Sequence, residues 1–195
     1  MKTSFPTAPG LAVFLLALLG ALAAVLPTGL QAQEGERWTP ELSMRYRAVG
    51  GVALSPDGGL VAYTVREAMM EGEKSEYLTH IWVASADGRR NVQFTRGEKS
   101  ASSPAFSPDG RLLAFTSSRS GSNQVWVMPV DGGEAEAVTS ADPGVGSFQW
   151  SPDGARIAYT MADPKTEEEK AADKEKRDVI LVDQNFKNVH LYVAP

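Results

Sequence analysis

The sequence of 195 residues contains no cysteine, so disulfide bonds and thiolate chemistry are excluded. Histidine occurs only twice, and there is no Cys/His cluster or aspartate-rich calcium loop, so we predict no metal site and no cofactor. The net charge is −5 and no basic patch with interleaved aromatic residues is present, which argues against a nucleic-acid partner. The Gly-x-Ser-x-Gly turn that presents a catalytic serine is also missing. We therefore predict no catalytic, cofactor-binding or metal-binding residue within this sequence.

Residues 1–32 have the layout of a secretory signal peptide. Lys2 is their only charged residue, an apolar run of 16 residues follows at 11–26, and Pro27 and Gly29 end it. A helix of that length spans about 24 Å, which is short of the roughly 30 Å of a bilayer core. We predict cleavage after Ala32 and a periplasmic or secreted protein without membrane contact, with a retained anchor as the alternative.

One four-residue motif, Ser-Pro-Asp-Gly, occurs three times, at 55–58, 107–110 and 151–154. Proline favours the second position of a tight turn and glycine the left-handed conformation at its end, so each copy should join two antiparallel strands. A short apolar strand follows each copy. The copies start 52 and 44 residues apart (55 to 107 and 107 to 151), about the length of a four-stranded propeller blade.

We predict an all-β fold made of consecutive four-stranded antiparallel blades of a β-propeller, preceded by the signal-peptide helix. The expected boundaries are a linker at 33–47 and a partial propeller at 48–195, with blade one at 48–96, blade two at 101–140 and an incomplete blade three at 146–195. These blades are too few to close a ring.

Aromatic residues recur at two places in each blade. The third strands contain Trp82, Trp126 and Tyr192, and the second strands contain Tyr63, Phe115 and Tyr159. We interpret all six as blade-core residues, and we expect Trp82 and Trp126 between neighbouring sheets.

Blades one and three carry insertions between their second and third strands. Residues 67–74 should form a loop in blade one. The charged insertion 163–178 of blade three has alternating signs and no apolar stripe, so we predict an exposed, partly helical excursion. Residues 178–183 look like an extra strand. Blade three has no fourth strand before Pro195, so we expect this sequence to be the amino-terminal piece of a longer protein.

The two histidines occupy equivalent places in the repeat. His80 and His190 each precede the third-strand aromatic residue by two positions, where blade two has Gln124. Equivalent positions on different blades lie far apart, so we predict structural polar residues rather than a shared metal site or a catalytic histidine.

Three groups of stretches resemble a known family: 61–67 with 79–84, 114–121 with 132–135, and 163–170 with 177–178 and 190–193. From Ala48 to Pro195 the sequence resembles the propeller half of secreted serine peptidases of the prolyl oligopeptidase family, in the branch of acylaminoacyl-peptidases and dipeptidyl-peptidases. TolB-like periplasmic propellers share the Ser-Pro-Asp-Gly repeat, whereas the acidic insertion is more specific to the peptidases.

The resemblance implies an exported serine peptidase whose amino-terminal propeller gates the access of short peptides to a carboxy-terminal α/β-hydrolase domain. That domain would supply the Ser, Asp and His residues and the oxyanion hole, and it would lie downstream of this sequence. The expected partners are peptide substrates, through the full-length enzyme, and the protein's own catalytic domain. This piece alone should be inactive. The alternative is a TolB-like periplasmic propeller that binds envelope proteins.

Two further groups of charged residues are candidates for structural or functional roles. We expect Arg66 and Arg119, which follow the second strands, to pair with carboxylates between blades. The acidic run Glu167, Glu168 and Glu169 should be a solvated surface, and a site for a substrate's α-amino group is the alternative.

Overall fold

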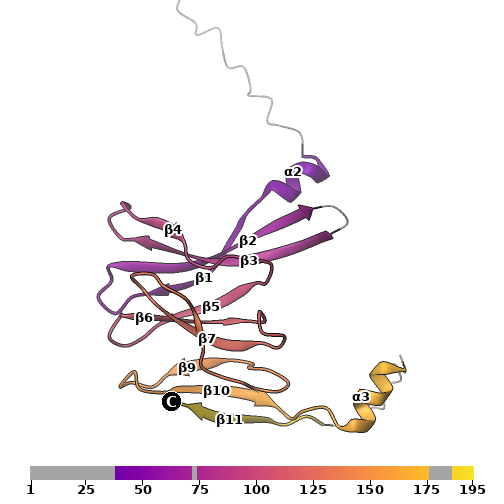
Figure 1. Cartoon of the computed structure of the whole chain (residues 1–195). Coiled ribbons are helices and arrows are strands. Elements are labelled where there is room, and N and C mark those ends of the chain that lie inside the picture. The colour runs from indigo at the N-terminus through magenta and orange to yellow at the C-terminus, as the bar shows by residue number, and fades with distance from the viewer. Residues whose placement is uncertain (1–37, 72–73, 176–185) are drawn as a thin grey trace, which may run out of the picture. The chain divides into compact units, whose positions relative to one another are not determined.

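The structure is a computed structural model that describes residues 38–71, 74–175 and 186–195 (Figure 1). A compact unit begins at Pro40, inside the segment expected to be a linker. The short helix α2 (Pro40–Arg45) opens this unit, and antiparallel strands make up nearly all the rest. No helix in the described parts of the chain is long and apolar enough to cross a bilayer.

The strands form three antiparallel sheets that follow one another along the chain. Blade one consists of β1 (Ala48–Leu54), β2 (Leu60–Glu71), β3 (Lys74–Ser85) and β4 (Asn91–Gln93). Blade two consists of β5 (Ala101–Phe106), β6 (Leu112–Ser117), β7 (Gln124–Pro129) and β8 (Glu136–Ala137). Blade three contributes β9 (Phe148–Trp150), β10 (Ile157–Ala162) and β11 (Val189–Ala194).

Within each sheet, every strand pairs with its neighbour in the sequence, and the three sheets stack one on the next (Figure 1). This arrangement confirms the predicted all-β fold of four-stranded blades, with three described strands in the last one. The described strands do not close a ring.

The Ser-Pro-Asp-Gly turn is held by its own side chains, as blade two illustrates. The Ser107 hydroxyl donates to Asp109 Oδ1 (2.6 Å) and accepts from the Leu112 N–H (2.9 Å). Asp109 also accepts from the Arg111 N–H, and Gly110 is left-handed with φ 73°. The hydrogen bond from Ser107, followed by that from the Arg111 backbone, holds the pKa of Asp109 below its ordinary value.

The same turn occurs a fourth time without proline, between β3 and β4. Ser85 and Asp87 make the same pair of hydrogen bonds, and Gly88 has φ 74°. Ala86 stands where the other copies have proline, and its N–H donates to the Gly59 carbonyl (2.9 Å). Proline lacks that donor, which explains why it is excluded here.

Two apolar clusters join the blades. Between blades one and two, Ile81 and Val83 pack with Leu113 and Phe115, and all four side chains are fully buried. The other cluster lies between blades two and three and contains Ala114, Val125, Val145 and Ile157. The core therefore consists of layers between stacked sheets, as in a propeller.

The aromatic residues divide between buried and open faces. Trp126 packs in the layer between blades one and two, as predicted, and Tyr159 packs between blades two and three, where it stacks on Tyr192. The prediction is wrong for Trp82 and Tyr63, which are cross-strand partners. Side chains alternate along a strand, so burial of Ile81 and Val83 toward blade two places Trp82 on the opposite face.

Residues 67–74 do not form the predicted loop. The two strands instead continue as a ladder from Leu60 paired with Ser85 to Glu71 paired with Lys74. Leu78 on this extension is only 3% exposed, and Arg66 lies over the Tyr77 ring at 4.2 Å. These contacts favour a long hairpin over a loop in blade one.

The charged insertion of blade three is exposed and partly helical in its described part, as predicted. Helix α3 (Glu167–Lys174) begins with a capping box, in which the Thr166 hydroxyl accepts from the Glu169 N–H and the Glu169 carboxylate from the Thr166 N–H. It has no buried residue. The predicted extra strand at 178–183 lies outside the described residues.

Candidate functional site

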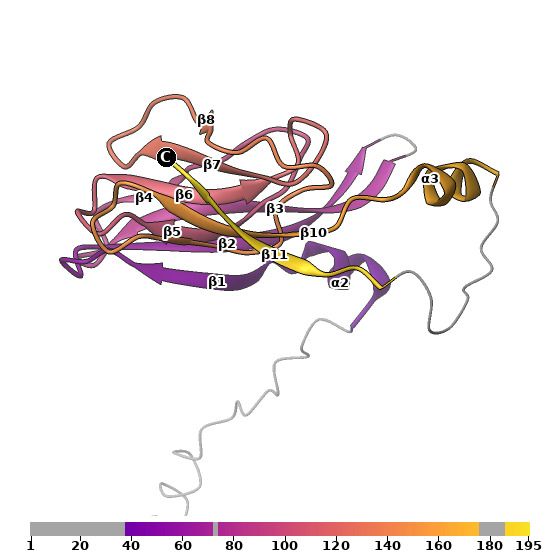
Figure 2. The same cartoon turned by 90° about the horizontal axis from the view of Figure 1, so that it is seen from below.

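The two ends of the blades differ in their side chains. The three Ser-Pro-Asp-Gly turns and the Asp87 turn connect strands at one end. The long β2–β3 hairpin and helix α3 both extend from the opposite end, the hairpin from blade one and the helix from blade three (Figure 1 and Figure 2). That projecting end carries the acidic run Glu167–Glu169, which lies in helix α3.

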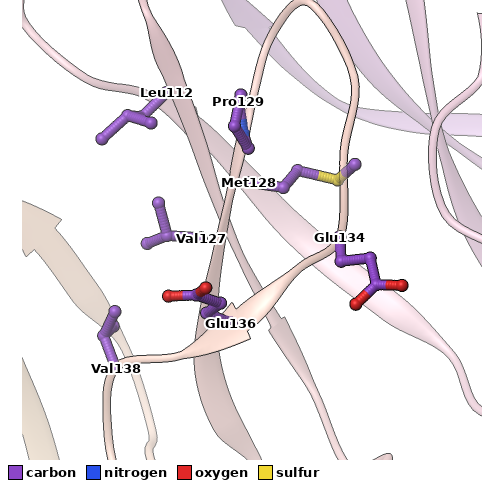
Figure 3. Close-up of a pocket in the computed structure, with 7 residues that line it drawn as sticks. All are labelled: Leu112, Val127, Met128, Pro129, Glu134, Glu136 and Val138. Atoms are coloured by element: carbon purple, nitrogen blue, oxygen red, sulfur yellow. The ribbon is translucent and has the colours of Figure 1, made fainter.

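An apolar groove of about 450 Å³ lies at the outer edge of blade two, where β8 is the last strand (Figure 3). Its lining residues are Leu112, Val127, Met128, Pro129, Glu134, Glu136 and Val138. In Figure 3, Met128 and Glu134 lie on one side of the β7 ribbon, and Val127 and Val138 lie on the other. The only titratable groups in it are the two glutamates, so the groove contains no nucleophile paired with a base.

A second cleft of about 350 Å³ lies between blades one and two, and it contains Arg119 and Arg96. The Arg119 guanidinium lies over two aromatic rings, 5.3 Å from the centre of Phe115 and 5.0 Å from that of Trp126. Partial desolvation lowers the pKa of Arg119 from its ordinary value, and the group stays charged. Within the described parts of the chain, its hydrogen bond runs from Nε to Ser117 Oγ over 3.4 Å.

The predicted ion pairs of Arg66 and Arg119 are wrong. Among the described residues, neither guanidinium lies within 4 Å of a carboxylate, and both lie over aromatic rings instead. Such cation–π contacts contribute about 0.5–1 kcal/mol at exposed positions. Each of these contacts joins residues of the same blade, and none of them joins two neighbouring blades.

His80 is a buried structural residue, as its place in the repeat predicted. It is 5% exposed, and burial is the main cause that lowers its pKa below the ordinary 6.5. The positive charge of Arg119 acts in the same direction, whereas Glu67 and a hydrogen bond with the Gly97 backbone oppose it. Its Nδ1 has no hydrogen-bond partner among the residues that the structure describes.

Gln124 fills the equivalent place in blade two with a complete set of hydrogen bonds. Its amide donates to the Ala141 carbonyl (2.7 Å) and accepts from the Ala141 N–H and the Thr139 hydroxyl. That hydroxyl also accepts from the Val125 N–H, and Thr95 does the same for Ile81 in blade one. These residues attach each blade's third strand to the segment that leads to the next blade.

His190 is the second histidine, and it lies at the base of the insertion, away from His80. Its Nε2 lies 2.8 Å from Asp163 Oδ1, and the Asn188 N–H donates to Asp163 Oδ2 (3.0 Å). The Asn188 backbone, followed by His190, keeps the pKa of Asp163 below its ordinary value. In the described residues no serine or threonine hydroxyl donates to either histidine, and no three metal-binding side chains form a cluster.

The acidic run is part of helix α3. Glu169 caps the helix and pairs with Lys187 (2.6 Å), and Glu167 pairs with Lys170 (2.8 Å). Glu167 and Glu168 are exposed, as the prediction of a solvated surface requires. Two of the three carboxylates thus already have cationic partners.

These blades define the chain as part of a β-propeller, and comparison with known proteins gives the family. The chain belongs to the family described as TolB beta propeller domain (PD40), which matches residues 41–195. The relatives include the uncharacterized peptidase YuxL of Bacillus subtilis, 40% identical over 67 residues, which are 34% of this chain and 10% of YuxL. Dipeptidyl-peptidase 5 of Porphyromonas gingivalis is 35% identical over 91 residues, 47% of this chain and 13% of that protein.

Solved structures support the same fold. The acylaminoacyl peptidase of Pyrococcus horikoshii matches with a TM-score of 0.59 and 21% identity, over 80% of this chain and 24% of that one. The AtxE2 isopeptidase matches with a TM-score of 0.61 and 22% identity, over 80% and 30%. The chain spans between a tenth and a sixth of the length of its curated relatives. The predicted resemblance to the propeller part of peptidases is confirmed.

Proposed function

We propose that this chain is the amino-terminal propeller segment of an exported serine peptidase of the prolyl oligopeptidase family, and that it gates the access of short peptides to a catalytic domain. The observation that supports this most directly is its identity to peptidases across the blades, up to 40% over 67 residues. The acidic insertion in blade three agrees with the same branch.

A role in gating also agrees with the chemistry of the described residues. The blades provide apolar grooves, stacked arginines and paired carboxylates, but no hydroxyl is hydrogen-bonded to a histidine base. Peptide-bond cleavage would then be the task of another domain of the same protein. The propeller would exclude folded proteins by its size.

The alternative is a TolB-like periplasmic propeller that binds envelope proteins. It is favoured by the family description, which names the TolB propeller. The two proposals differ in what the gene encodes after Pro195. A Gly-x-Ser-x-Gly motif followed by Asp and His would support the peptidase, whereas only further blades and a stop codon would support the binding protein.

The activity test compares this chain with the longest product of its gene, using aminoacyl and dipeptidyl nitroanilides. We expect the longer product to hydrolyse one of these classes and to be inactivated by a serine-directed organophosphate. The 195-residue chain should show no turnover. Turnover by the chain alone, or an organophosphate-resistant longer product, would refute the proposal.

Export is tested separately, by fractionation of the producing cells and mass spectrometry of the protein. We expect a periplasmic or secreted protein that begins at Gln33, because Leu30-Gln31-Ala32 follows the apolar run as a small-residue cleavage site. An intact amino terminus in the membrane fraction would support the retained anchor instead.

A further inference from the structure

One position of the repeat carries an acidic side chain in two blades and a cationic side chain in the third. Four residues after the second-strand aromatic residue stand Glu67 in blade one, Arg119 in blade two and Asp163 in blade three. Glu67 pairs with Arg47 (3.0 Å), and Asp163 accepts from the Asn188 N–H (3.0 Å). Both acidic residues thus have partners that satisfy their charge.

Arg119 has no such partner in the described parts of the chain. No carboxylate there lies within 4 Å of its guanidinium, and the hydrogen bond from Nε to Ser117 leaves Nη1 and Nη2 without an acceptor. The rings of Phe115 and Trp126 contact the guanidinium and limit its orientation. A planar cation with free terminal N–H groups can bind a carboxylate through two parallel hydrogen bonds.

The cleft that contains Arg119 has room for a small ligand. Its volume is about 350 Å³, and its lining comes from both blade one and blade two. The ionisable residues of this lining are Arg96, Arg119 and Glu134, so the cleft has a net positive charge. Both blades have all four strands, so the walls of the cleft are complete.

The rest of the lining suits a carboxylate that is attached to an apolar group. Phe94, Phe115 and Met128 provide apolar surface. Thr95 is 3% exposed, and its hydroxyl accepts from a backbone N–H but donates to none of the residues that the structure describes. In blade two, the equivalent hydroxyl donates to Gln124. The cleft therefore combines available hydrogen-bond donors with an apolar surface.

We propose that the cleft between blades one and two binds a small carboxylate with an apolar neighbouring group, and that Arg119 is its bidentate donor. Arg96 adds a second positive charge, whereas Glu134 opposes the binding of an anion. We expect a Kd on the order of 1 mM, because the guanidinium is only partly desolvated. This inference does not rest on the proposed function, since blades one and two alone form the site.

The first test titrates the 195-residue chain with N-acetyl-leucine and with N-acetyl-leucinamide, followed by calorimetry. The two probes have the same apolar side chain and differ in the charge of one end. We expect the acid to bind at least about tenfold more tightly than the amide, because only the acid is a charged acceptor. Inorganic phosphate should bind more weakly than N-acetyl-leucine, because it gains nothing from the apolar lining.

Four variants locate the binding, and circular dichroism verifies that each is folded. Arg119→Gln should weaken the binding of N-acetyl-leucine about tenfold, and Arg119→Lys should weaken it less, since lysine keeps the charge but not the fork of donors. Glu134→Gln should strengthen binding, because it removes a like charge from the cleft. Arg111→Gln is the matched control at an exposed turn, and its affinity should equal that of the wild type.

His80 provides a readout that a change in folding alone would not produce. Burial is the main cause that lowers its pKa, and the charges of Glu67 and Arg119 then act in opposite directions, with Arg119 lowering it. A carboxylate bound to Arg119 would offset that positive charge. We expect N-acetyl-leucine to raise the pKa of His80, measured from the NMR signal of its ring C–H, and N-acetyl-leucinamide to leave it unchanged.

Several results would each overturn the proposal. Absence of binding, or equal affinity for the acid and the amide, would show that the cleft does not select a carboxylate. Unchanged affinity in Arg119→Gln would place the binding elsewhere, and if that variant does not fold, weaker binding by Glu134→Gln would refute the site instead. Tighter binding of phosphate would contradict the apolar contact. Loss of binding in the longest product of the gene would show that the protein's own groups occupy the cleft.

Discussion

At the scale of single residues, the turn glycines show what a local motif contributes and what stacking adds. Gly58 and Gly154 have φ of 71° and 70°, so alanine at either position should cost about 1–2 kcal/mol of backbone strain. Only at Gly154 would the new Cβ also meet a neighbouring blade, at Pro108. We therefore expect Gly154→Ala to lower the free energy of unfolding in urea more than Gly58→Ala.

Gly110→Ala provides an internal comparison, because its Cβ would approach Pro56 at the more ordinary distance of 3.5 Å. Its cost should lie between those of the other two variants. Equal costs at all three positions would show that the turns of neighbouring blades do not touch in solution.

His80 makes stability depend on pH near neutrality. Its pKa is lowered in the folded protein by burial, so the unfolded chain binds the proton more readily. The resulting stability is complete above the ordinary pKa of 6.5 and is lost as pH falls below it. We expect the melting temperature of the wild-type chain to fall between pH 7 and pH 5.

The matched variant is His80→Gln, since Gln124 fills the equivalent place in blade two with hydrogen bonds to Thr139 and Ala141. Melting curves followed by circular dichroism should show a smaller pH dependence for this variant and a similar stability at pH 7. A fall of the same size in both proteins would show that His80 does not cause it.

The residues that the sequence could predict are those governed by local rules. Proline and glycine fix the geometry of each Ser-Pro-Asp-Gly turn. His80 and Gln124 each precede the third-strand aromatic residue by two positions, so the sequence shows that they occupy equivalent places in the repeat. Arg119 could not be placed in this way, because its stacking on Phe115 and Trp126 depends on where two strands meet. An arginine after a strand fits an ion pair and an aromatic contact equally well.

At the scale of elements, the number and order of strands follow from the sequence, but the length of some does not. The hairpin of β2 and β3 extends through Met69 and Met70, where the sequence has polar and apolar residues without clear alternation. The face of Trp82 was also missed, because alternation predicts which residues share a face but not which face the next sheet covers. The first error concerns where two strands end, and the second concerns tertiary packing.

We expect that removing the charged excursion leaves the blade that carries it folded. The Asp163 N–H donates to the Asn188 carbonyl over 2.9 Å, so the two ends of the excursion already meet as a strand pair. Replacing residues 164–187 by Asn-Gly would close that pair with a two-residue hairpin turn. Helix α3 has no buried residue, so we expect a change in melting temperature below about 2 °C, which corresponds to under 1 kcal/mol.

The matched control for this deletion keeps the excursion but removes the helix cap, by Thr166→Ala. It should reduce helicity by circular dichroism and leave the main melting transition in place, since a cap contributes about 1 kcal/mol to the local helix only. A large loss of stability in the deletion variant would show that the excursion packs on the blades.

At the scale of the whole molecule, the fold was predictable because it is a repeat. The stacked aromatic and cationic residues of the inter-blade cleft were not, since they come from Phe94, Arg96 and Arg119 on two different blades. A repeat constrains each layer and its neighbours, and it therefore also predicts the chemistry of the faces at the two ends.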